Sequence, residues 1–380
     1  MKIMVVPDSF KGTLSAVEVS RHMTAGIHRA APDARVVAMP LADGGEGTLE
    51  AVHYALGGDF VSLEVTGPLG DRVACRYGLI EGKKRAVIEM AESSGLVLIE
   101  DRKNPMKAST RGLGEMIRHA LDLGVRDFYI GIGGSASNDG GIGMAGALGA
   151  VFTDAQGKDI SLDGEGLGFL HRIDLSGLDP RIQASRFTVI CDVDNPLYGE
   201  NGAAYVYGPQ KGATGEMVAV LDRNLRNFSQ VIARDLETDV SALEGAGAAG
   251  GLGAGLVVFL KAELARGIDL VLELYHFKEQ LRDVDLIITG EGRLDTQSLR
   301  GKVPLGVAGA AREFSIPVVA ITGEIGEGTG EIYAQGITAV FSTNPKPQAY
   351  SEARREAGKN VEQTTENILR LFLEGRQQGD

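Results

Sequence analysis

The sequence predicts an α/β protein of two domains, one of which is discontinuous. Short apolar, β-rich runs alternate with apolar residues at helical spacing near both ends of the chain, which is typical of parallel βαβ units. Between them the pattern changes to a hairpin and long glycine-rich segments. The chain has 380 residues, enough for two domains of ordinary size.

The amino-terminal elements follow from apolar spacing. An apolar run predicts a strand at 3–6, and apolar residues at helical spacing predict a helix that Pro32 ends. A second strand is predicted at 36–39 and a second helix at 48–56. The order strand, helix, strand, helix predicts a parallel sheet.

From about residue 72 two β-rich runs flank the turn EGKK and predict an antiparallel hairpin. The elements expected after it are a helix at 110–123, strands at 128–130, 187–191 and 285–289, a helix at 303–314, strands at 318–321 and 337–341, and a helix at 352–373. We therefore predict a discontinuous Rossmann-like three-layer domain (1–71 and 284–380). A second α/β domain (72–283), containing a mixed sheet, is inserted in it, with the active site expected in the cleft between them.

Composition excludes several function classes. Lys and Arg number 38 against 51 Asp and Glu, and the net charge of −13 argues against binding nucleic-acid phosphates or anionic lipid. Two cysteines, Cys75 and Cys191, give neither a disulfide framework nor a zinc-site spacing. No apolar run approaches the ~20 residues of a membrane span. We expect a cytoplasmic protein with small-molecule partners, no nucleic acid and no membrane, and a homodimer is left open.

The 53 glycines gather in loops that mostly follow predicted strands, where open α/β sheets bind ligands. PDSFKGTLSA places Asp8 and Lys11 between a strand and a helix whose N-cap is expected at Ser15, a setting that favours an anion. PLADGGEGT places Asp43 and Glu46 among glycines, where carboxylates can accept from hydroxyls or hold hydrated magnesium. A capped turn and an ordinary Asp-Gly turn are the structural alternatives.

The segment GIGGSASNDGGIGMAG, residues 131–146, is the richest in backbone N–H groups that can face an oxyanion. Ser135 and Ser137 add hydroxyl donors, so the segment has what a phosphate cradle needs. It also matches G-x-G-x-x-A, with Asp154 about twenty residues on, which is typical of a dinucleotide site. The polar run SASND argues against the close helix packing of such a site, and a structural loop is the remaining alternative.

Three further segments are rich in glycine. In CDVDNPLYGENGAAYVYGPQKGA, Asp192 and Asp194 follow a predicted strand, and Lys211 can meet a phosphate or carboxylate as a mobile point charge. GAGAAGGLGAGL, at 245–256, offers only backbone donors or tight helix packing. The segment TGEGRLDTQSLRGKVP concentrates many polar side chains in one strand-to-helix loop: Glu291, Arg293, Asp295, Thr296, Gln297, Ser298 and Lys302.

Missing motifs narrow the chemistry. All six histidines lie outside these loops, which disfavours Ser-His-Asp hydrolysis and histidine-zinc catalysis. Neither a G-x-x-x-x-G-K-[ST] loop nor a protein-kinase catalytic loop occurs. The carboxylates, lysines, hydroxyls and glycine backbone that remain suit phosphoryl transfer with magnesium.

Ten stretches then carry a resemblance to the bacterial two-domain glycerate kinases. They are PDSFKGTLSA, ADGGEGT, VTGPLG, IEMAESSGL, GIGGSASNDGG, CDVDNPL, GPQKGA, GAGAAGG, ITGEGRLDTQS and GKVPLGVA. They occur in the family's order from Pro7 to about Ala308. The resemblance implies ATP-dependent phosphorylation of D-glycerate, most often at the 2-hydroxyl, to give 2-phosphoglycerate and ADP. It also implies a Rossmann-like domain made from both termini with an inserted α/β domain.

Within that resemblance we assign the substrate and the base by charge. The glycerate carboxylate is expected to meet Lys11 with the adjoining helix start, or Arg293. Asp8 or Asp43 would accept from the glycerate hydroxyls. The attacking hydroxyl needs a carboxylate within hydrogen-bond reach, for which we expect Asp192, with Asp295 as the alternative.

ATP and Mg²⁺ are the expected cofactors. The ATP phosphates are expected on the glycine-rich segment 131–146, at Gly133, Gly134, Ser135 and Asn138. Lys211 would neutralise charge as the γ-phosphoryl group leaves. Magnesium takes one or two carboxylates and several waters, for which we expect Glu291 and Asp295.

Two functions from other classes stay open on the sequence. An NAD-dependent hydroxy-acid oxidoreductase would rest on the G-x-G-x-x-A match and Asp154. A sugar-acid sensor without catalysis would rest on the two-domain cleft alone, and the many positioned charges disfavour it.

Overall fold

A computed structural model describes residues 1–41, 47–295, 303–327, 330–346 and 349–377. The chain divides into two compact units. Unit 1 comprises Met1–Asp43, Glu50–Gly57 and Arg266–Asp380, and unit 2 comprises Gly44–Leu49 and Gly58–Ala265. The chain passes from unit 2 to unit 1 within α2 (Thr48–Leu56).

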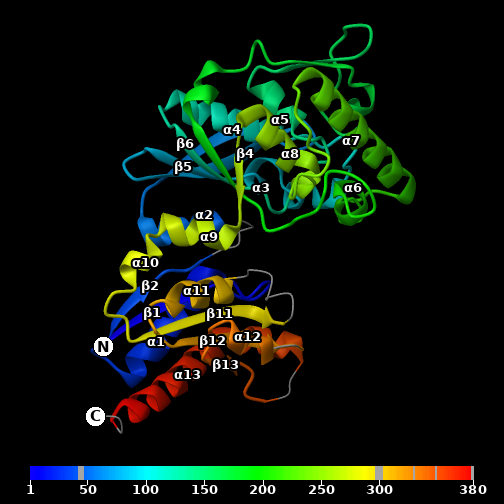
Figure 1. Cartoon of the computed structure of the whole chain (residues 1–380). Helices are drawn as coiled ribbons and strands as arrows, with labels where there is room; N and C mark the ends of the chain where they lie inside the picture. The colour runs from blue at the N-terminus through cyan, green and yellow to red at the C-terminus, as the bar shows by residue number, and fades with distance from the viewer. Residues whose placement is uncertain (42–46, 296–302, 328–329, 347–348, 378–380) are drawn as a thin grey trace. The chain divides into compact units, whose positions relative to one another are not determined.

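Unit 1 is built on a parallel five-stranded sheet of order β13-β12-β11-β1-β2 (Figure 1). Its strands are β1 (Lys2–Pro7), β2 (Arg35–Ala38), β11 (Leu286–Leu294), β12 (Val318–Ile325) and β13 (Ala339–Ser342). Residues 3–6 of β1 are wholly buried, so both faces of this strand are covered. Parallel sheets need such cover on both faces, which explains the continuous apolar run in the sequence.

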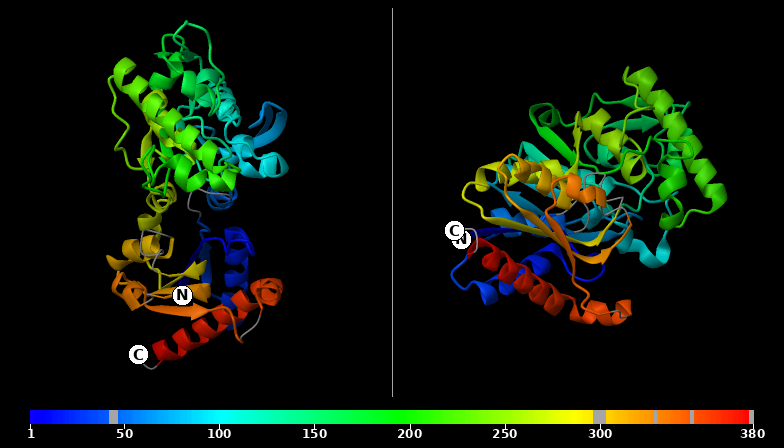
Figure 2. Two further views of the ribbon diagram at one scale, coloured as in Figure 1. Left: turned by 90° about the vertical axis from the view of Figure 1, so that its right-hand side faces the viewer. Right: turned by 60° about the horizontal axis from the view of Figure 1, so that its bottom comes forward.

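Helices cover the sheet of unit 1 in two layers. On one face α1 (Ala16–Ala30) and α13 (Tyr350–Gln377) share one apolar cluster with the sheet, and Figure 2 shows the red α13 alongside the blue α1. On the other face α11 (Val303–Arg312) packs on β11 and β12, with α9 (Gly267–Leu274) against it (Figure 1). The unit also contains α10 (Phe277–Gln280) and α12 (Gly330–Ala334). The three-layer α/β arrangement expected from the sequence is confirmed.

A capping box fixes the start of α1. The Ser15 hydroxyl accepts from the Glu18 backbone N–H at 3.3 Å, and the Glu18 carboxylate accepts from the Ser15 backbone N–H at 2.8 Å. These hydrogen bonds hold the pKa of Glu18 below its usual range. The N-cap expected at Ser15 is confirmed, and such a cap contributes about 1 kcal/mol to helix stability.

Unit 2 contains a mixed six-stranded sheet of order β10-β9-β6-β5-β4-β3, as the sequence predicts. Its strands are β3 (Asp59–Thr66), β4 (Arg72–Ile80), β5 (Arg85–Glu89), β6 (Asp127–Gly131), β9 (Arg186–Ile190) and β10 (Glu263–Ala265). The last four named run parallel, whereas β3, β4 and β5 pair antiparallel. A separate two-stranded hairpin joins β7 (Val151–Thr153) and β8 (Arg172–Asp174).

Helices of varied length and 3₁₀ turns surround the sheet of unit 2. The helices are α3 (Ala91–Ser94), α4 (Arg111–Asp122), α5 (Ile142–Ala147), α6 (Ala203–Tyr207), α7 (Gly215–Asp235) and α8 (Ala248–Leu260), and the turns are η1 (Leu96–Arg102), η2 (Gly166–Phe169), η3 (Pro180–Ala184) and η4 (Pro209–Lys211). Phe128 of β6 stacks on Phe187 of β9, with ring centroids 4.7 Å apart. Both rings are buried, so neighbouring parallel strands are joined by aromatic packing in the core.

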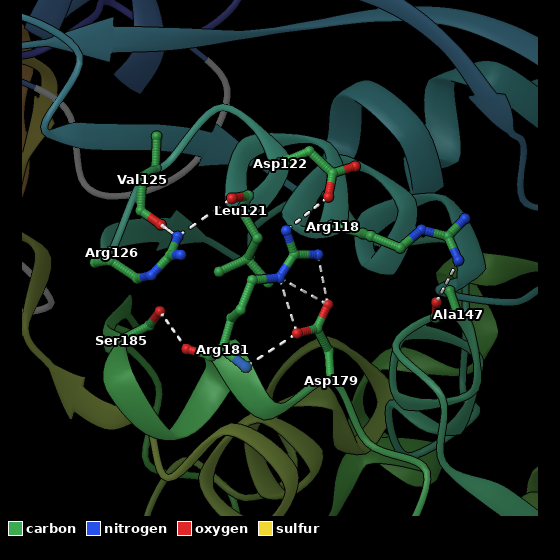
Figure 3. A network of polar contacts seen from close by, with 9 residues as sticks. All are labelled: Arg118, Leu121, Asp122, Val125, Arg126, Ala147, Asp179, Arg181 and Ser185. Atoms are coloured by element: carbon green, nitrogen blue, oxygen red, sulfur yellow. Dashed lines mark hydrogen bonds and ion pairs between the residues drawn. The ribbon is translucent and has the colours of Figure 1, made fainter.

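Arg181 ties η3 to the end of α4 (Figure 3). Its guanidinium donates to Asp122 Oδ1 at 2.7 Å and to Asp179 Oδ2 at 2.6 Å. Asp179 also accepts from the Arg181 backbone N–H at 3.0 Å, and the adjacent guanidinium holds the pKa of Asp179 below its usual range. Arg126 donates to the carbonyls of Leu121 and Val125 and so adds side-chain hydrogen bonds where α4 ends. The network is structural.

The structure differs from the sequence-based prediction at several strands. The prediction missed β3, β8 and β10. The strand predicted at 187–191 is β9, which ends at Ile190 and does not continue to Asp192. Among the described residues, no helix is both long enough and apolar enough to cross a membrane.

Candidate active site

The glycine-rich segment of unit 2 begins where β6 ends. Gly131, the last residue of β6, lies beside Ile190, the last residue of β9, so the loops after both strands leave the same edge of the sheet. Gly133 is half-buried and Gly134 is exposed. The structure therefore places the expected phosphate segment and the segment containing Asp192 at neighbouring strand ends, where α/β sheets bind ligands.

Hydrogen bonds hold the backbone of this segment. Gly134 has φ +70°, which favours glycine, and its carbonyl accepts from Leu96 N at 2.8 Å. Ala136 N donates to Ser94 O at 2.9 Å. The segment is thus pinned on both sides of Ser135 before any ligand binds.

Lys211, on η4, points into the same segment. Its ammonium donates to Ser135 Oγ at 2.7 Å and to the carbonyl of Ser137 at 2.6 Å, and the side chain is 1% exposed. Burial lowers the pKa of Lys211 to about 7, and the nearby Asp139 opposes that change. The expectation of a mobile point charge is wrong in this respect, because the amine is fixed and shielded from solvent.

Two buried polar side chains beside this lysine have no hydrogen-bond partner among the described residues. They are Ser137, through its hydroxyl, and Asn138, through both atoms of its amide. Leaving such groups unpaired costs about 1–3 kcal/mol each. Unpaired polar atoms next to a buried ammonium are typical of a site that a polar ligand completes.

The glycine-rich segment 245–256 packs against this loop. Gly250 has φ +73°, and a Cβ there would overlap the carbonyl oxygen of Ser137. Gly140 N donates to Gly250 O at 3.1 Å, and Gly247 N donates to Asn195 O at 3.0 Å. Of the two alternatives for residues 245–256, the structure supports tight backbone packing.

Asp192 is exposed and follows β9 by two residues. The chain turns away there: Cys191 N still bonds to Ala265 O at 2.9 Å, but the Cys191 thiol bonds forward to Val193 O at 3.3 Å. Burial raises the pKa of Cys191, which keeps its thiol protonated. Asp192 thus has the access to a ligand that a general base needs.

In unit 1 the candidate residues lie just after β1 and in or just after the last part of β11. Pro7 lies beside Gly290 in the parallel ladder, and Asp8 N extends it by donating to Gly290 O at 2.8 Å. The next residue on each strand is an acid, Asp8 and Glu291, and both are buried. Neighbouring strands are ~4.8 Å apart, so the backbones of Asp8 and Glu291 lie next to each other.

Lys11 lies in the turn between β1 and α1, and its side chain is exposed. A Cβ on Gly292 would come within 3.3 Å of Lys11 N, so the turn packs closely against β11. Lys11 therefore belongs to the same strand-end group as Glu291. Asp43, the other predicted substrate ligand here, lies outside the described residues, as do Glu46, Thr296, Gln297, Ser298 and Lys302.

Arg293 is already engaged by acids. Its Nε lies 3.0 Å from Asp295 Oδ2 and 3.7 Å from Glu324 Oε1 on β12. Asp295 is mostly buried, with 15% of its side chain exposed, so this pair is partly shielded from solvent. The structure thus brings Arg293 and Asp295 together with each other.

The expected magnesium pair does not fit one ion. Glu291 lies on β11 and Asp295 just past its end, four residues later. An extended strand rises ~3.3 Å per residue, so their Cα atoms are roughly 13 Å apart. Two carboxylates reaching one ion at ~2.1 Å need a closer approach. Among the described residues no group of three or more His, Cys, Asp or Glu could hold a metal.

The structure disfavours a dinucleotide site, because Asp154 does not lie where the ribose-binding acid of such a site is needed. Asp154 follows β7, which belongs to the separate hairpin and not to the sheet that contains β6. Its carboxylate accepts from Gln156 N and Lys158 N at 2.9 Å each, as in an ordinary turn. A ribose-binding acid would stand at the end of a strand in the same parallel sheet.

The sequence analysis did not single out two buried acids in unit 2. Glu89 ends β5 beside Gly131 and accepts from Leu49 N at 2.6 Å. Asp139 lies inside the glycine-rich segment and is completely buried. The acid that ends the apolar run RAVIE was a usable signal for Glu89, whereas Asp139 reads in the sequence as one more polar loop residue.

Comparisons with known proteins agree over nearly the whole chain. The model of the glycerate kinase family matches residues 3–373. The glycerate kinase of Halalkalibacterium halodurans is 47% identical over 96% of this chain and 97% of its own length. The glycerate 2-kinase of Escherichia coli K12 is 46% identical over 99% of each chain. A crystal structure described as glycerate kinase 2 from Salmonella typhimurium LT2 superposes with a TM-score of 0.89, at 49% identity and 99% coverage of both chains. On these matches, the chain belongs to the glycerate kinase family.

Proposed function

We infer that this protein transfers the γ-phosphoryl group of ATP to the 2-hydroxyl of D-glycerate, giving 2-phosphoglycerate and ADP. The observation that carries the inference is the 46% identity, over 99% of both chains, to a relative named glycerate 2-kinase. The family model matches residues 3–373, which include the candidate residues of unit 1 around β1 and β11 and those of unit 2 after β6 and β9. The chemistry of those groups, carboxylates with buried and exposed lysines, suits phosphoryl transfer.

We propose that the glycine-rich segment of unit 2 receives the ATP phosphates. Gly133 and Gly134 leave the backbone accessible, and Ser135 and Asn138 supply side-chain donors beside the Lys211 ammonium. A buried ammonium interacts with phosphate more strongly than an exposed one because water does not screen it. Lys211 then neutralises charge as the γ-phosphoryl group leaves.

We propose Asp8 and Glu291 as the carboxylates that hold Mg²⁺, in place of Glu291 and Asp295. Both are buried, Asp8 directly follows β1 and Glu291 lies on the neighbouring strand β11, and one or two carboxylates suffice for this ion. With Mg²⁺ held there by Asp8 and Glu291, the ion would supply positive charge that offsets the charge of the phosphates. Mn²⁺ binding followed by electron paramagnetic resonance tests the assignment without turnover: Asp8→Asn should weaken it, and equal binding in both proteins would refute it.

Glycerate is assigned to the remaining groups. Lys11 takes the carboxylate, because it is an exposed cation in the turn between β1 and α1. Asp192 is the proposed general base, because it is an exposed carboxylate two residues after the end of β9. The attacking hydroxyl gives its proton to Asp192 as its oxygen bonds to the phosphorus.

The test is ADP release from the purified protein with ATP, Mg²⁺ and D-glycerate, compared with the same mixture without glycerate. We expect ADP only when glycerate is present. Glycerate-dependent NAD reduction would support an oxidoreductase instead, and glycerate binding without ADP release would support a sensor. Either result would overturn the proposed kinase.

A further inference from the structure

The Asp139 carboxylate is the buried acid closest in sequence to the proposed phosphate residues, and no role above uses it. Its side chain is fully buried and accepts four hydrogen bonds. Oδ2 accepts from Thr110 N at 2.8 Å, Thr110 Oγ1 at 2.7 Å and Gly143 N at 3.3 Å, and Oδ1 accepts from Gly141 N at 3.1 Å. A buried acid with so many donors holds separate segments together.

The segments it joins are the starts of two helices. Thr110 is the N-cap of α4 and makes no capping bond with its own side chain, so Asp139 supplies the acceptor at that end. Thr110 Oγ1 in turn accepts from Met144 N of α5 at 3.0 Å. Gly143 leaves no room for a side chain, since a Cβ there would lie 2.8 Å from Asp139 Oδ2. One carboxylate thus anchors the glycine-rich segment to both α4 and α5.

All four of these hydrogen bonds are donated to the Asp139 carboxylate by N–H or O–H groups. An ionised carboxylate satisfies every one of these bonds, whereas a neutral amide would turn an N–H₂ group toward a donor. Burial raises the pKa of Asp139, and the hydrogen bonds from Thr110, Gly141 and Gly143 oppose that rise.

The same segment holds the Lys211 amine. The two acceptors of that amine, Ser135 Oγ and Ser137 O, precede Asp139 by four and two residues. Asp139 is the charged group that raises the proton affinity of Lys211 against the effect of burial. A second lysine, Lys103, lies near this turn, because its Cβ is close to Gly212, the residue after η4. Unlike Lys211, Lys103 has an exposed side chain.

We propose that Asp139 is a positioning residue for phosphoryl transfer: it anchors Ser135 and Ser137 to α4 and α5 and places a carboxylate charge near the buried Lys211 amine. The proposal rests on the proposed kinase function. Asp139 would touch neither ATP nor glycerate and would act through Lys211.

The decisive variant is Asp139→Asn, which keeps the size and removes the charge. We expect the KM for ATP to rise at least tenfold, with a smaller change in the KM for glycerate. The alkaline limb of kcat/KM for ATP should move to lower pH by about one pH unit, because Lys211 loses its proton sooner without the nearby carboxylate. A residue with a structural role alone would lower the melting temperature and leave that limb in place.

The matched control is Asp179→Asn. Asp179 is also a shielded acid that accepts a backbone N–H, from Arg181, and it lies near the far end of α4 (Figure 3). Its substitution removes the same charge from unit 2. We expect a lower melting temperature and an unchanged pH profile, which isolates the effect of Asp139 on Lys211.

Direct titration of Lys211 needs no substrate. Lysine labelled with ¹³C at Cε, with the Lys211 signal assigned by its loss in Lys211→Met, should titrate at lower pH in Asp139→Asn than in the unaltered protein. Equal titration and an equal KM for ATP would overturn the proposal. If glycerate phosphorylation itself fails, this titration still reports on Asp139, so the two failures are distinguishable.

A second variant covers the case in which Asp139→Asn does not fold. Thr110→Val removes the hydroxyl that bridges Asp139 and Met144 but keeps the carboxylate and the shape of the side chain. We expect the KM for ATP to rise about fivefold to tenfold, as the loss of one hydrogen bond predicts. Lys211 should titrate at the same pH as in the unaltered protein, because the Asp139 carboxylate is still present. A lower melting temperature with an unchanged KM would contradict the anchoring role.

Discussion

Replacing Lys211 by methionine tests the structural cost of the buried ammonium. The side chain is 1% exposed, and burial lowers its pKa from 10.5 to about 7. Between these two values the unfolded chain binds the proton and the folded protein does not, so stability rises with pH across this window. The full effect is about 5 kcal/mol, of which roughly 2 kcal/mol is recovered between pH 7 and pH 9.

The assay is urea unfolding followed by circular dichroism at pH 7 and pH 9, for the unaltered protein and for Lys211→Met. The difference in the free energy of unfolding between the two proteins should change by roughly 2 kcal/mol between these pH values, because other titrating groups are common to both. A difference that does not depend on pH would refute the assignment of a depressed lysine pKa.

Turnover of the same variant tests its chemical role. We expect kcat to fall about 10²- to 10³-fold, the usual cost of removing one electrostatic group from a phosphoryl-transfer or oxyanion site. Lys158→Met, at an exposed lysine of the same unit, is the control and should keep full activity. Unchanged turnover in Lys211→Met would leave the amine with a structural role alone.

Three further predictions concern a base, an ion network and a glycine. Asp192→Asn should abolish turnover while isothermal titration calorimetry still detects glycerate binding, and retained turnover would move the base elsewhere. Arg181→Ala should lower the melting temperature by about 2–4 °C, the equivalent of ~1 kcal/mol, and leave kcat unchanged; a lower kcat would show that the network reaches the site. Gly250→Ala should cost more than ~1 kcal/mol in unfolding free energy, since its φ is +73° and Ser137 O occupies the space of a Cβ. Gly215→Ala, at an open position that begins α7, should cost nothing, and equal losses would contradict the packing argument.

The fold could be predicted where strands are buried on both faces, because such strands appear in the sequence as continuous apolar runs. The apolar runs of β1, β11 and β12 indicate a buried parallel sheet, and these strands pair in parallel in the structure. β3 was missed because it is an edge strand with a largely exposed face, so its apolar signal is weak. β10 has three residues and depends on tertiary pairing with β9.

The candidate site was predictable by residue type but not by contact. Glycines and hydroxyls after β6 marked a phosphate segment, yet no local pattern shows that Lys211, 76 residues after Ser135, is buried against it. The anchoring by Asp139 depends on Thr110, 29 residues earlier, and was overlooked for the same reason. The sequence also places Glu291 and Asp295 in what looks like one loop, whereas in the structure Glu291 lies within β11 and Asp295 just past its end.

The most direct test of the account is phosphorus NMR of the protein incubated with D-glycerate, ATP and Mg²⁺. The account predicts that the ATP signals give way to those of ADP and 2-phosphoglycerate. A 3-phosphoglycerate signal would contradict the assigned hydroxyl, and intact ATP without any phosphoester would contradict the kinase itself.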